Sequence, residues 1–590
     1  MLKQPPAFTV TGGFLPGPRA PIPVTLWLPA DRSPRCWVIH VPAFADEMNK
    51  GRALVAAQAR AFAGQGIATL LPDLLGTGDS ALAFEHATVD SWLEELRSVA
   101  DWCTHQGARR VLFWGLRSGC LLASTIAATD DGRLPLRGLL YWQPTLSGAL
   151  LVRQFLRLRL AAALYGGRKE SLGELRERLL GGETLEVAGY RLSGELLSGL
   201  EAQRLLPPPP GCPLDLFEVT AATTCSAALL RWREALPAEH AVALHTAPGD
   251  SFWMTQELGE ADALQALTTR VAGERSAAWE RPAAAVAATL PPAAAAREAL
   301  AFDSGGDVLL GQLQRSAEPR AIGVLVLVGG PQYRVGSHRQ FHDLAQDLVA
   351  AGYDCMRFDY RGRGDSGGIF PGFRHVDDDI RAALDEFAAR CPRLRGIVLW
   401  GLCDAATAAL AYDAGDTRVA GYVLANPWVT DGQGRAAVVL RHYYWQRLRS
   451  RAFWRKLLGG AWNAGTSLRA FAATLRATWR ERSTAPGTGA AGAASRPPLA
   501  QADNLASWFS AALHGCDKPV CLLLSGRDLT AAEFRERVLA GTSLPAHVQR
   551  IEAPLAQANH TFSSGDARAA AAQCTLRFLD ALAAEKRDAT

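Results

Sequence analysis

Short apolar segments alternate with amphipathic helical segments along the second half of the chain. Five segments are apolar enough and short enough to be strands: residues 321–328, 354–359, 396–400, 421–425 and 520–524. Helices are expected at residues 338–351 and 376–390, from Asp404 onwards, and after Ser563. Apolar strands separated by amphipathic helices are typical of a parallel sheet that is covered on both faces. The pattern therefore predicts an α/β fold.

The first half repeats this pattern, with strands expected at residues 37–41, 68–72, 111–114 and 138–142. The residues themselves also match. QGIATLLPDLLGTGDS (residues 65–80) corresponds to AGYDCMRFDYRGRGDS (residues 351–366), and FWGLRSG (residues 113–119) corresponds to LWGLCDA (residues 399–405). Both pairs lie 286 positions apart. Two matches in one register indicate a tandem duplication.

The chain has 590 residues, more than one hydrophobic core usually holds. We expect one domain over residues 1–276 and a second over residues 301–590. The Ala- and Pro-rich residues 277–300 are expected to form a semi-rigid linker between them. A cap is expected at about residues 428–515, and the low-complexity run 483–498 within it is expected to be a disordered loop tip.

The strand that ends at Trp400 runs into Gly-Leu-Cys-Asp-Ala, the pattern of a nucleophile elbow. Such a turn needs small residues two positions before and after its tip, and Gly401 and Ala405 flank Cys403 in this way. At the tip, the Cys403 thiol is expected to face the N-terminus of the next helix, whose dipole favours the thiolate.

An acid and a base follow this elbow in the order that such a fold requires. Asp528 ends the segment VCLLLSGRD, and His560 lies in QANHTFSS just before the last helix. In such a triad, His560 deprotonates Cys403 and Asp528 orients the imidazole. The oxyanion hole is expected to combine the backbone N–H groups of Gly330 and Asp404. This chemistry calls for no cofactor and no metal ion.

These motifs resemble those of the α/β hydrolases. With GGPQYRVGSHRQF (residues 329–341), DYRGRGDS and WGLCDA, the second half resembles the exosortase A system-associated hydrolase 1 family. With HVPAFADEMNK (residues 40–50) and WGLRSG, the first half resembles hydrolase 2 of the same system. The resemblance implies two tandem α/β-hydrolase domains, encoded beside exopolysaccharide biosynthesis and PEP-CTERM sorting genes in Gram-negative bacteria. The cysteine nucleophile is also similar to that of the dienelactone hydrolases.

Several of these residues have a structural alternative. Cys403 could be a buried core residue. Arg334, His338 and Arg339 are candidates for binding an anionic substrate, and the alternative is that the arginines pair with internal carboxylates.

The first copy is expected to lack a catalytic site. Its elbow glycines flank Arg117, which stays protonated and cannot attack a carbonyl. Glu234 stands near the acid position, whereas Phe252 and Trp253 stand where the base would be. Arg117 could instead bind a carboxylate or phosphate, or pair internally with Glu234 or Asp73.

The expected cap contains a basic, aromatic-rich stretch at residues 441–482, with ten basic residues and one acidic residue. We interpret it as a lid over the pocket, with peripheral contact to an anionic membrane as the alternative. Nucleic acid is not an expected partner because no recognised binding motif accompanies the charge.

The charge and cysteine content of the chain indicate its cellular compartment. The net charge is only +4, and the eleven cysteines include no C-x-x-C pair, as expected in a reducing compartment. We expect a cytoplasmic protein, with a peripheral location at the inner membrane as the alternative. The expected triad predicts an ester or thioester hydrolase or an acyl transferase. The family resemblance implies that its substrate is a small molecule or an acylated saccharide or lipid of exopolysaccharide synthesis. The alternative is a non-catalytic scaffold or binding protein of that machinery.

Overall fold

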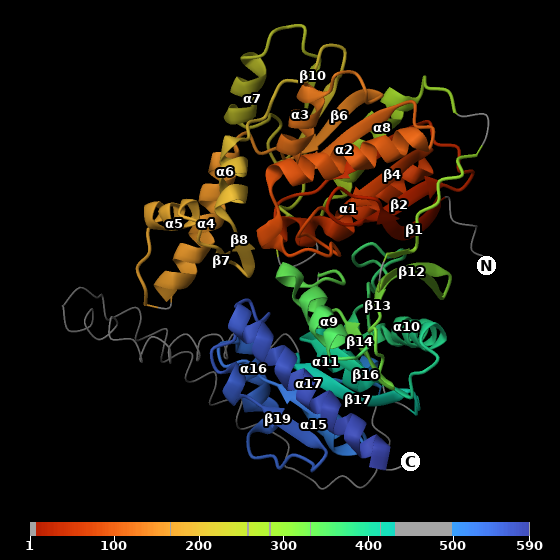
Figure 1. The fold of residues 1–590 in the computed structure, drawn as a ribbon, viewed down its shortest axis with the longest axis vertical. Coiled ribbons are helices and arrows are strands. Elements are labelled where there is room, and N and C mark those ends of the chain that lie inside the picture. The colour runs from red at the N-terminus through yellow and green to blue at the C-terminus, as the bar shows by residue number, and fades with distance from the viewer. Residues whose placement is uncertain are drawn as a thin grey trace, which may run out of the picture.

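The structure is a computed structural model. It describes residues 8–165, 167–255, 259–281, 285–294, 296–330, 332–412, 415–430 and 498–588. The chain folds into two similar halves, each built around one large sheet with helices on both faces (Figure 1). A small antiparallel hairpin belongs to the first half.

The sheet of the first half has eight strands. In spatial order they are β1 (Phe8–Leu15), β2 (Ile22–Pro29), β4 (Ile67–Pro72), β3 (Cys36–Val41), β5 (Val111–Leu116), β6 (Leu136–Trp142), β9 (Leu214–Val219) and β10 (Val242–Ala247). β1, β2 and β4 pair antiparallel, and the remaining pairs are parallel.

The sheet of the second half has nine strands. In spatial order they are β11 (Ala293–Ala294), β12 (Arg297–Ser304), β13 (Asp307–Gln314), β15 (Cys355–Phe358), β14 (Ile322–Leu327), β16 (Gly396–Leu402), β17 (Val419–Ala425), β18 (Val520–Leu523) and β19 (Val548–Ile551). From β12 onwards, each strand takes the place of its counterpart in the first sheet. The predicted parallel sheets and the duplication are both confirmed.

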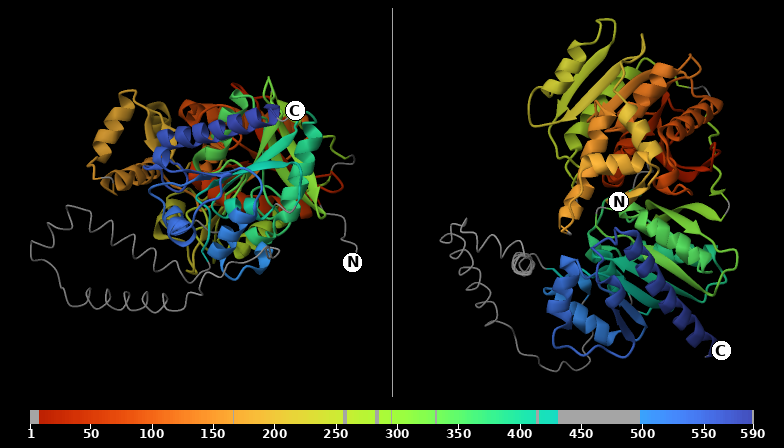
Figure 2. Two further views of the ribbon diagram at one scale, coloured as in Figure 1. Left: turned by 90° about the horizontal axis from the view of Figure 1, so that it is seen from below. Right: turned by 60° about the vertical axis from the view of Figure 1, so that its left-hand side comes forward.

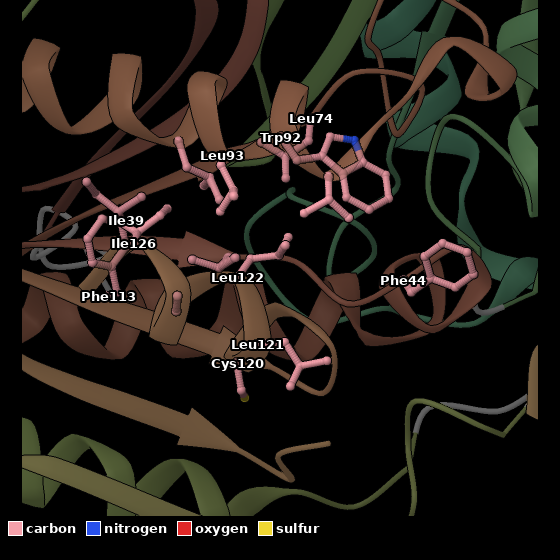
Figure 3. Close-up of a cluster of buried hydrophobic side chains, with 14 of the residues drawn as sticks. Ile39, Phe44, Leu74, Trp92, Leu93, Phe113, Cys120, Leu121, Leu122 and Ile126 are labelled. Carbon is pink, nitrogen blue, oxygen red and sulfur yellow. The ribbon is translucent and has the colours of Figure 1, made fainter. Parts of the chain in front are cut away.

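Helices bury their apolar sides on the two faces of each sheet. In the first half these are α1 (Asp46–Gly64) and α8 (Asp262–Ser276) on one face, and α2 (Val89–His105) and α3 (Gly119–Thr129) on the other. Figure 3 shows part of the second layer, where Trp92 and Leu93 of α2 lie near Leu122 of α3.

The second half is layered in the same way. One face carries α9 (Gln340–Ala350) and α17 (Gly565–Asp588), and the other carries α10 (Asp377–Arg390), α11 (Asp404–Ala411) and α15 (Leu505–Gly515). α16 (Leu529–Phe534) follows β18. The expected cap ended at residue 515, but α15 lies in the core, with Phe509 and Leu513 fully buried. The cap expectation was therefore too long at its C-terminal end.

A helical excursion follows β6 in the first half. It contains α4 (Gly148–Tyr165), α5 (Leu172–Leu180), the hairpin β7 (Leu185–Val187) and β8 (Tyr190–Leu192), and α6 (Gly194–Ala202), and α7 (Ala227–Glu234) comes after β9. In Figure 1 the excursion extends from the first half towards the N-terminal end of α17. It therefore brings residues of the first half close to the second.

The residues expected to form a linker are more ordered than Ala- and Pro-rich composition indicates. Arg32 donates hydrogen bonds to the carbonyl oxygens of Val286 and Ala288, at 3.1 and 2.7 Å. Phe14 N–H donates to Pro291 at 2.9 Å, and Arg297 already begins β12. The segment is thus held against the first half and ends as part of the second sheet.

A cluster of buried charges joins the two halves, which lie one above the other in Figure 2. We call it the interface charge cluster; its members are Arg52, Asp73, Asp79, Arg334, Arg357, Asp359 and Asp365. The four aspartates belong to the duplicated DLLGTGDS and DYRGRGDS loops. In each loop the second aspartate donates its backbone N–H to the first, so they shape the turns and also pair across the interface.

Candidate active site

Cys403 stands at a sharp turn between β16 and α11. Its backbone has φ 62° and ψ −124°, a conformation that a residue with a side chain adopts only under strain. The turn is tight, since a Cβ at Gly401 would lie 2.6 Å from the carbonyl oxygen of Ala405. This is the geometry that a nucleophile elbow requires.

The structure brings together the three residues expected to form the triad. The Asp528 carboxylate lies 3.0 Å from Nδ1 of His560, and the imidazole also forms a hydrogen bond with the Cys403 thiol. With Nδ1 donating to Asp528, Nε2 remains for the sulfur. Asp528 is fixed in turn, because it caps α16 and accepts hydrogen bonds from the backbone N–H groups of Thr530 and Ala531.

Burial and neighbouring groups shift the pKa values of both Cys403 and His560. Burial raises the pKa of the Cys403 thiol, and the hydrogen bond from His560 opposes that rise only in part. Burial lowers the pKa of His560, but its bonds with Asp528 and Cys403 outweigh this effect and raise the pKa to about 10. The thiol and the imidazole therefore titrate as a coupled pair, and loss of a proton from this pair gives the reactive thiolate.

Asn426 is a residue of this site that the sequence analysis did not identify. It is fully buried at the end of β17, and its Nδ2 donates to the carbonyl oxygen of His560 and to the Ser525 hydroxyl, both at 3.0 Å. It thereby ties the histidine loop to the end of the sheet. The available signal was its position, directly after an apolar strand whose carboxyl end faces the elbow.

One of the two backbone donors expected in the oxyanion hole is already hydrogen-bonded. The backbone N–H of Asp404 lies against the Cys403 sulfur. The backbone N–H of Gly330, however, donates to the Asp404 carboxylate, at 2.9 Å to Oδ1 and 3.2 Å to Oδ2. The carboxylate can approach because Gly329 has no side chain, and a Cβ there would lie 2.1 Å from Asp404 Oδ1. The expectation that Gly330 offers a free donor is corrected for this state of the site.

A cavity of about 760 Å³ opens over the triad. Cys403, Asp528 and His560 line it, together with Gly330 and Trp428. Arg363 and Arg527 belong to the same wall. A cavity of this volume can hold a small-molecule substrate.

The three residues expected to bind an anionic substrate lie in the contact between the halves. Arg334 pairs with Asp79 and Asp359, each at 2.7 Å. Arg339 donates to backbone carbonyls of the first half, including Gly78 at 3.0 Å and Leu82 at 2.8 Å.

His338 is also buried. Its Nε2 lies 3.1 Å from the carbonyl oxygen of Thr561. The cavity wall includes none of the three in the part of the chain that the structure describes. The substrate-binding expectation for Arg334, His338 and Arg339 is therefore corrected, and internal pairing takes its place.

The hairpin β7–β8 of the first half holds the loop that carries His560. Glu186 accepts a hydrogen bond from the backbone N–H of Gly565 at 2.9 Å and lies 3.7 Å from Arg568. Gly189 accepts a hydrogen bond from Arg568 at 3.2 Å. Because Gly565 begins α17, five residues after His560, these contacts fix one end of the histidine loop.

The elbow of the first half has the same backbone geometry but different chemistry. Arg117 stands at its tip with φ 55°. Its guanidinium pairs with Glu47 at 3.3 Å and lies over the Trp253 ring, 5.4 Å from the centroid. The partner is thus neither Glu234 nor Asp73, and the ion pair and the indole occupy the place of a nucleophile and a base.

Glu234 does not stand at the acid position. It is exposed at the C-terminal end of α7, and the residue at the N-cap position of α7 is Ser226. In the second half the corresponding cap of α16 is Asp528. The prediction for Glu234 was wrong by the length of one helix, because the start of α7 could not be located from the sequence.

The basic aromatic stretch at residues 441–482 and most of the low-complexity run 483–498 lie outside the described residues. Among the residues that are described, no helix is long and apolar enough to cross a membrane. Within the same residues, no group of three or more His, Cys, Asp or Glu side chains is arranged to hold a metal ion.

Residues 320–482 match the model of one protein family, described as serine aminopeptidase, S33. Solved structures with similar folds include an esterase of Pyrococcus furiosus, with 15% identity over 48% of this chain and 90% of its own, at a TM-score of 0.32. Est1E of Butyrivibrio proteoclasticus with bound ferulic acid shares 13% identity over 48% of this chain and 99% of its own, at a TM-score of 0.30. No curated protein matches. The chain has the α/β-hydrolase fold.

Proposed function

On this α/β-hydrolase fold, we propose that the second half is an enzyme that cleaves ester or thioester bonds, or transfers their acyl group, through Cys403. The observation that supports it is the connected set Asp528–His560–Cys403, with the sulfur on a strained turn at the floor of a cavity. A buried carboxylate that orients an imidazole towards a thiol is the arrangement used to activate a cysteine nucleophile.

In the proposed reaction, His560 takes the thiol proton while the sulfur of Cys403 attacks the carbonyl carbon of the substrate. The negative charge on the carbonyl oxygen is received by the backbone N–H of Asp404, and by that of Gly330 once the Asp404 carboxylate has moved away. The carbon–oxygen bond to the leaving alcohol then breaks, and His560 returns the proton to that alcohol. A thioester on Cys403 remains.

The thioester is released by a second attack. Water or an acceptor hydroxyl loses its proton to His560 and attacks the thioester carbonyl, and the thiol leaves with that proton. Hydrolysis and transfer share every group up to this point, so the choice depends on how well the cavity excludes water.

We assign no catalytic step to the first half. Its elbow presents Arg117 paired with Glu47, and its base position holds Trp253, so the described residues of this site include neither a nucleophile nor a base. Its contribution is structural, through the interface charge cluster and the hairpin β7–β8.

The biological setting rests on the resemblance of the motifs to the exosortase A system-associated hydrolases. It points to acyl groups on exopolysaccharide or on its lipid-linked precursors, with the protein in the cytoplasm or at the inner face of the membrane.

The experiment compares the full chain with Cys403→Ala and His560→Ala on short-chain aryl esters, while iodoacetamide labelling is mapped by mass spectrometry. Ten of the eleven cysteines are buried and Cys403 is partly exposed, so labelling should concentrate on Cys403. Each variant should lose at least about 100-fold in kcat/KM. Absence of turnover by the unaltered chain together with an unreactive Cys403 would favour a scaffold.

A further inference from the structure

Arg363 lines the same cavity as Cys403, and no carboxylate among the described residues forms an ion pair with it. Its Nε and Nη1 atoms are buried and make no hydrogen bond within the part of the chain that the structure describes. Arg361, two residues earlier in the same loop, forms an ion pair with Asp379 at 2.6 Å. The loop therefore presents two arginines, of which one has a carboxylate of its own and the other faces the cavity.

The guanidinium of Arg363 packs against a ring, although its buried Nε and Nη1 atoms have no hydrogen-bond acceptor among the described residues. It lies 4.0 Å from the centroid of the Phe370 ring, a cation–π contact. The nearby Asp404 acts on it through charge, but the Asp404 carboxylate is hydrogen-bonded to the backbone N–H groups of Gly330 and Ala405. Burial lowers the pKa of Arg363, which reflects the cost of keeping this cation out of water.

The first half offers an internal comparison for this loop. Gly76 and Gly78 correspond to Gly362 and Gly364, and all four have positive φ. Between the first pair stands Thr77, whose hydroxyl donates to the carbonyl oxygen of Leu74 at 2.7 Å. The turn thus forms without an arginine, so turn formation does not require Arg363. The arginine is present in the half that also has the cysteine, histidine and aspartate.

We propose that Arg363 binds an anionic group, a carboxylate or a phosphate, carried by the substrate whose acyl group Cys403 receives. The proposal rests on the proposed function of this site and names its substrate class. A buried cation without a partner destabilises a fold, and an anionic ligand supplies the missing charge and hydrogen-bond acceptors.

The test measures equilibrium binding, so that it does not depend on turnover. The full chain is titrated calorimetrically with the mono-anilide of glutaric acid, with phenyl phosphate and with neutral butyranilide. The anilides carry amide bonds in place of the ester. The same titrations are made with Arg363→Gln, with Arg363→Lys, and with Arg393→Gln as a matched control on an exposed arginine before β16.

We expect the unaltered chain to bind the glutaric anilide or phenyl phosphate about 10- to 100-fold more tightly than butyranilide. Arg363→Gln should abolish this preference, Arg363→Lys should retain part of it, and Arg393→Gln should leave it unchanged. Whichever anion is preferred identifies the ligand chemistry as carboxylate or phosphate.

Thermal unfolding of Arg363→Gln provides an independent measurement. Because the variant removes a partly buried cation that forms no ion pair with the described residues, its Tm should equal or exceed that of the unaltered chain. A preference that survives in Arg363→Gln, or equal or undetectable binding of all three probes by the unaltered chain, would overturn the proposal. If the unaltered chain does not turn over aryl esters but still prefers the anionic probe, the proposed function is wrong and the anion site is retained.

Discussion

Asp365 of the second half receives two hydrogen bonds from Arg52 of the first half, at 2.6 Å from Nε and 2.9 Å from Nη2. Both side chains are buried. The pair is completed by Asp73, which lies 2.8 Å from Nη1 of the same arginine. Arg52 of α1 therefore neutralises one aspartate from each of the two loops that arose from one duplicated segment, across the contact between the halves.

Removal of one partner of this pair should destabilise the whole chain. We expect Arg52→Met to reduce the free energy of unfolding by about 3–5 kcal/mol, because it leaves the buried Asp73 without its arginine and leaves Asp365 paired with Arg334 alone. The double variant Arg52→Met with Asp365→Leu should recover part of that loss. Urea unfolding of the four proteins measures the coupling. Additive effects in this cycle would contradict the interpretation.

The raised pKa of His560 predicts a pH dependence of stability. Its pKa is about 10 in the folded chain, above the 6.5 of a free histidine. The protonated form is therefore favoured by folding, and this contribution is fully present below pH 6.5 and is lost as the pH rises through 10. In urea unfolding, the difference in the free energy of unfolding between the unaltered chain and His560→Gln should decrease as the pH rises from 6.5 to 10. An advantage that does not change with pH would show that His560 gains no proton affinity on folding.

The reactivity of Cys403 should also rise with pH. The thiol and the imidazole both have raised pKa values, so the form of the pair with one proton fewer becomes populated on the alkaline side of neutrality. We expect the rate of iodoacetamide alkylation at Cys403 to increase from pH 7 towards pH 10. A rate that is already maximal at pH 6 would indicate a thiolate in the resting site.

The Asp404 carboxylate should limit catalysis in two separable ways. Its charge raises the pKa of the Cys403 thiol, and its oxygens occupy the backbone N–H of Gly330. Asp404→Asn removes the charge and keeps an acceptor for Gly330, whereas Asp404→Ala removes both. We expect faster alkylation of Cys403 in both variants, and a kcat on aryl esters raised about tenfold or more only in Asp404→Ala. A loss of activity in Asp404→Ala would show instead that the carboxylate is needed for the reaction.

The hairpin of the first half should affect the chemistry of the second. Glu186→Ala removes the acceptor for the backbone N–H of Gly565, at the end of the loop that carries His560. We expect kcat on an aryl ester to fall about tenfold with little change in KM, because His560 is displaced while the cavity is retained. Glu186→Gln keeps an acceptor and should restore most of the rate. Glu183→Ala, which breaks an exposed pair with Arg178, is the control and should have no effect.

Much of the fold was predictable from local pattern. The apolar periodicity located β3, β5, β14 and β16 to within a few residues, because residues that face a core must be apolar whatever the tertiary arrangement is. The elbow could also be recognised from the sequence, because the strand and helix approach so closely that only small residues fit two positions before and after Cys403. Cys403, Asp528 and His560 do meet, as their order along the chain implied, and their chemical roles remain predictions.

Most of the corrected expectations concern charged side chains. Arg334 and Arg339 were expected in the cavity and lie between the halves, and Arg117 pairs with Glu47 of α1. A charge can be neutralised by any opposite charge or carbonyl that folding brings near it, and no periodicity records which one that is. The sequence alone therefore determined the two sheets and the residues of the elbow. Only the tertiary structure decided which charges are satisfied within the fold and which, like that of Arg363, are left facing the cavity.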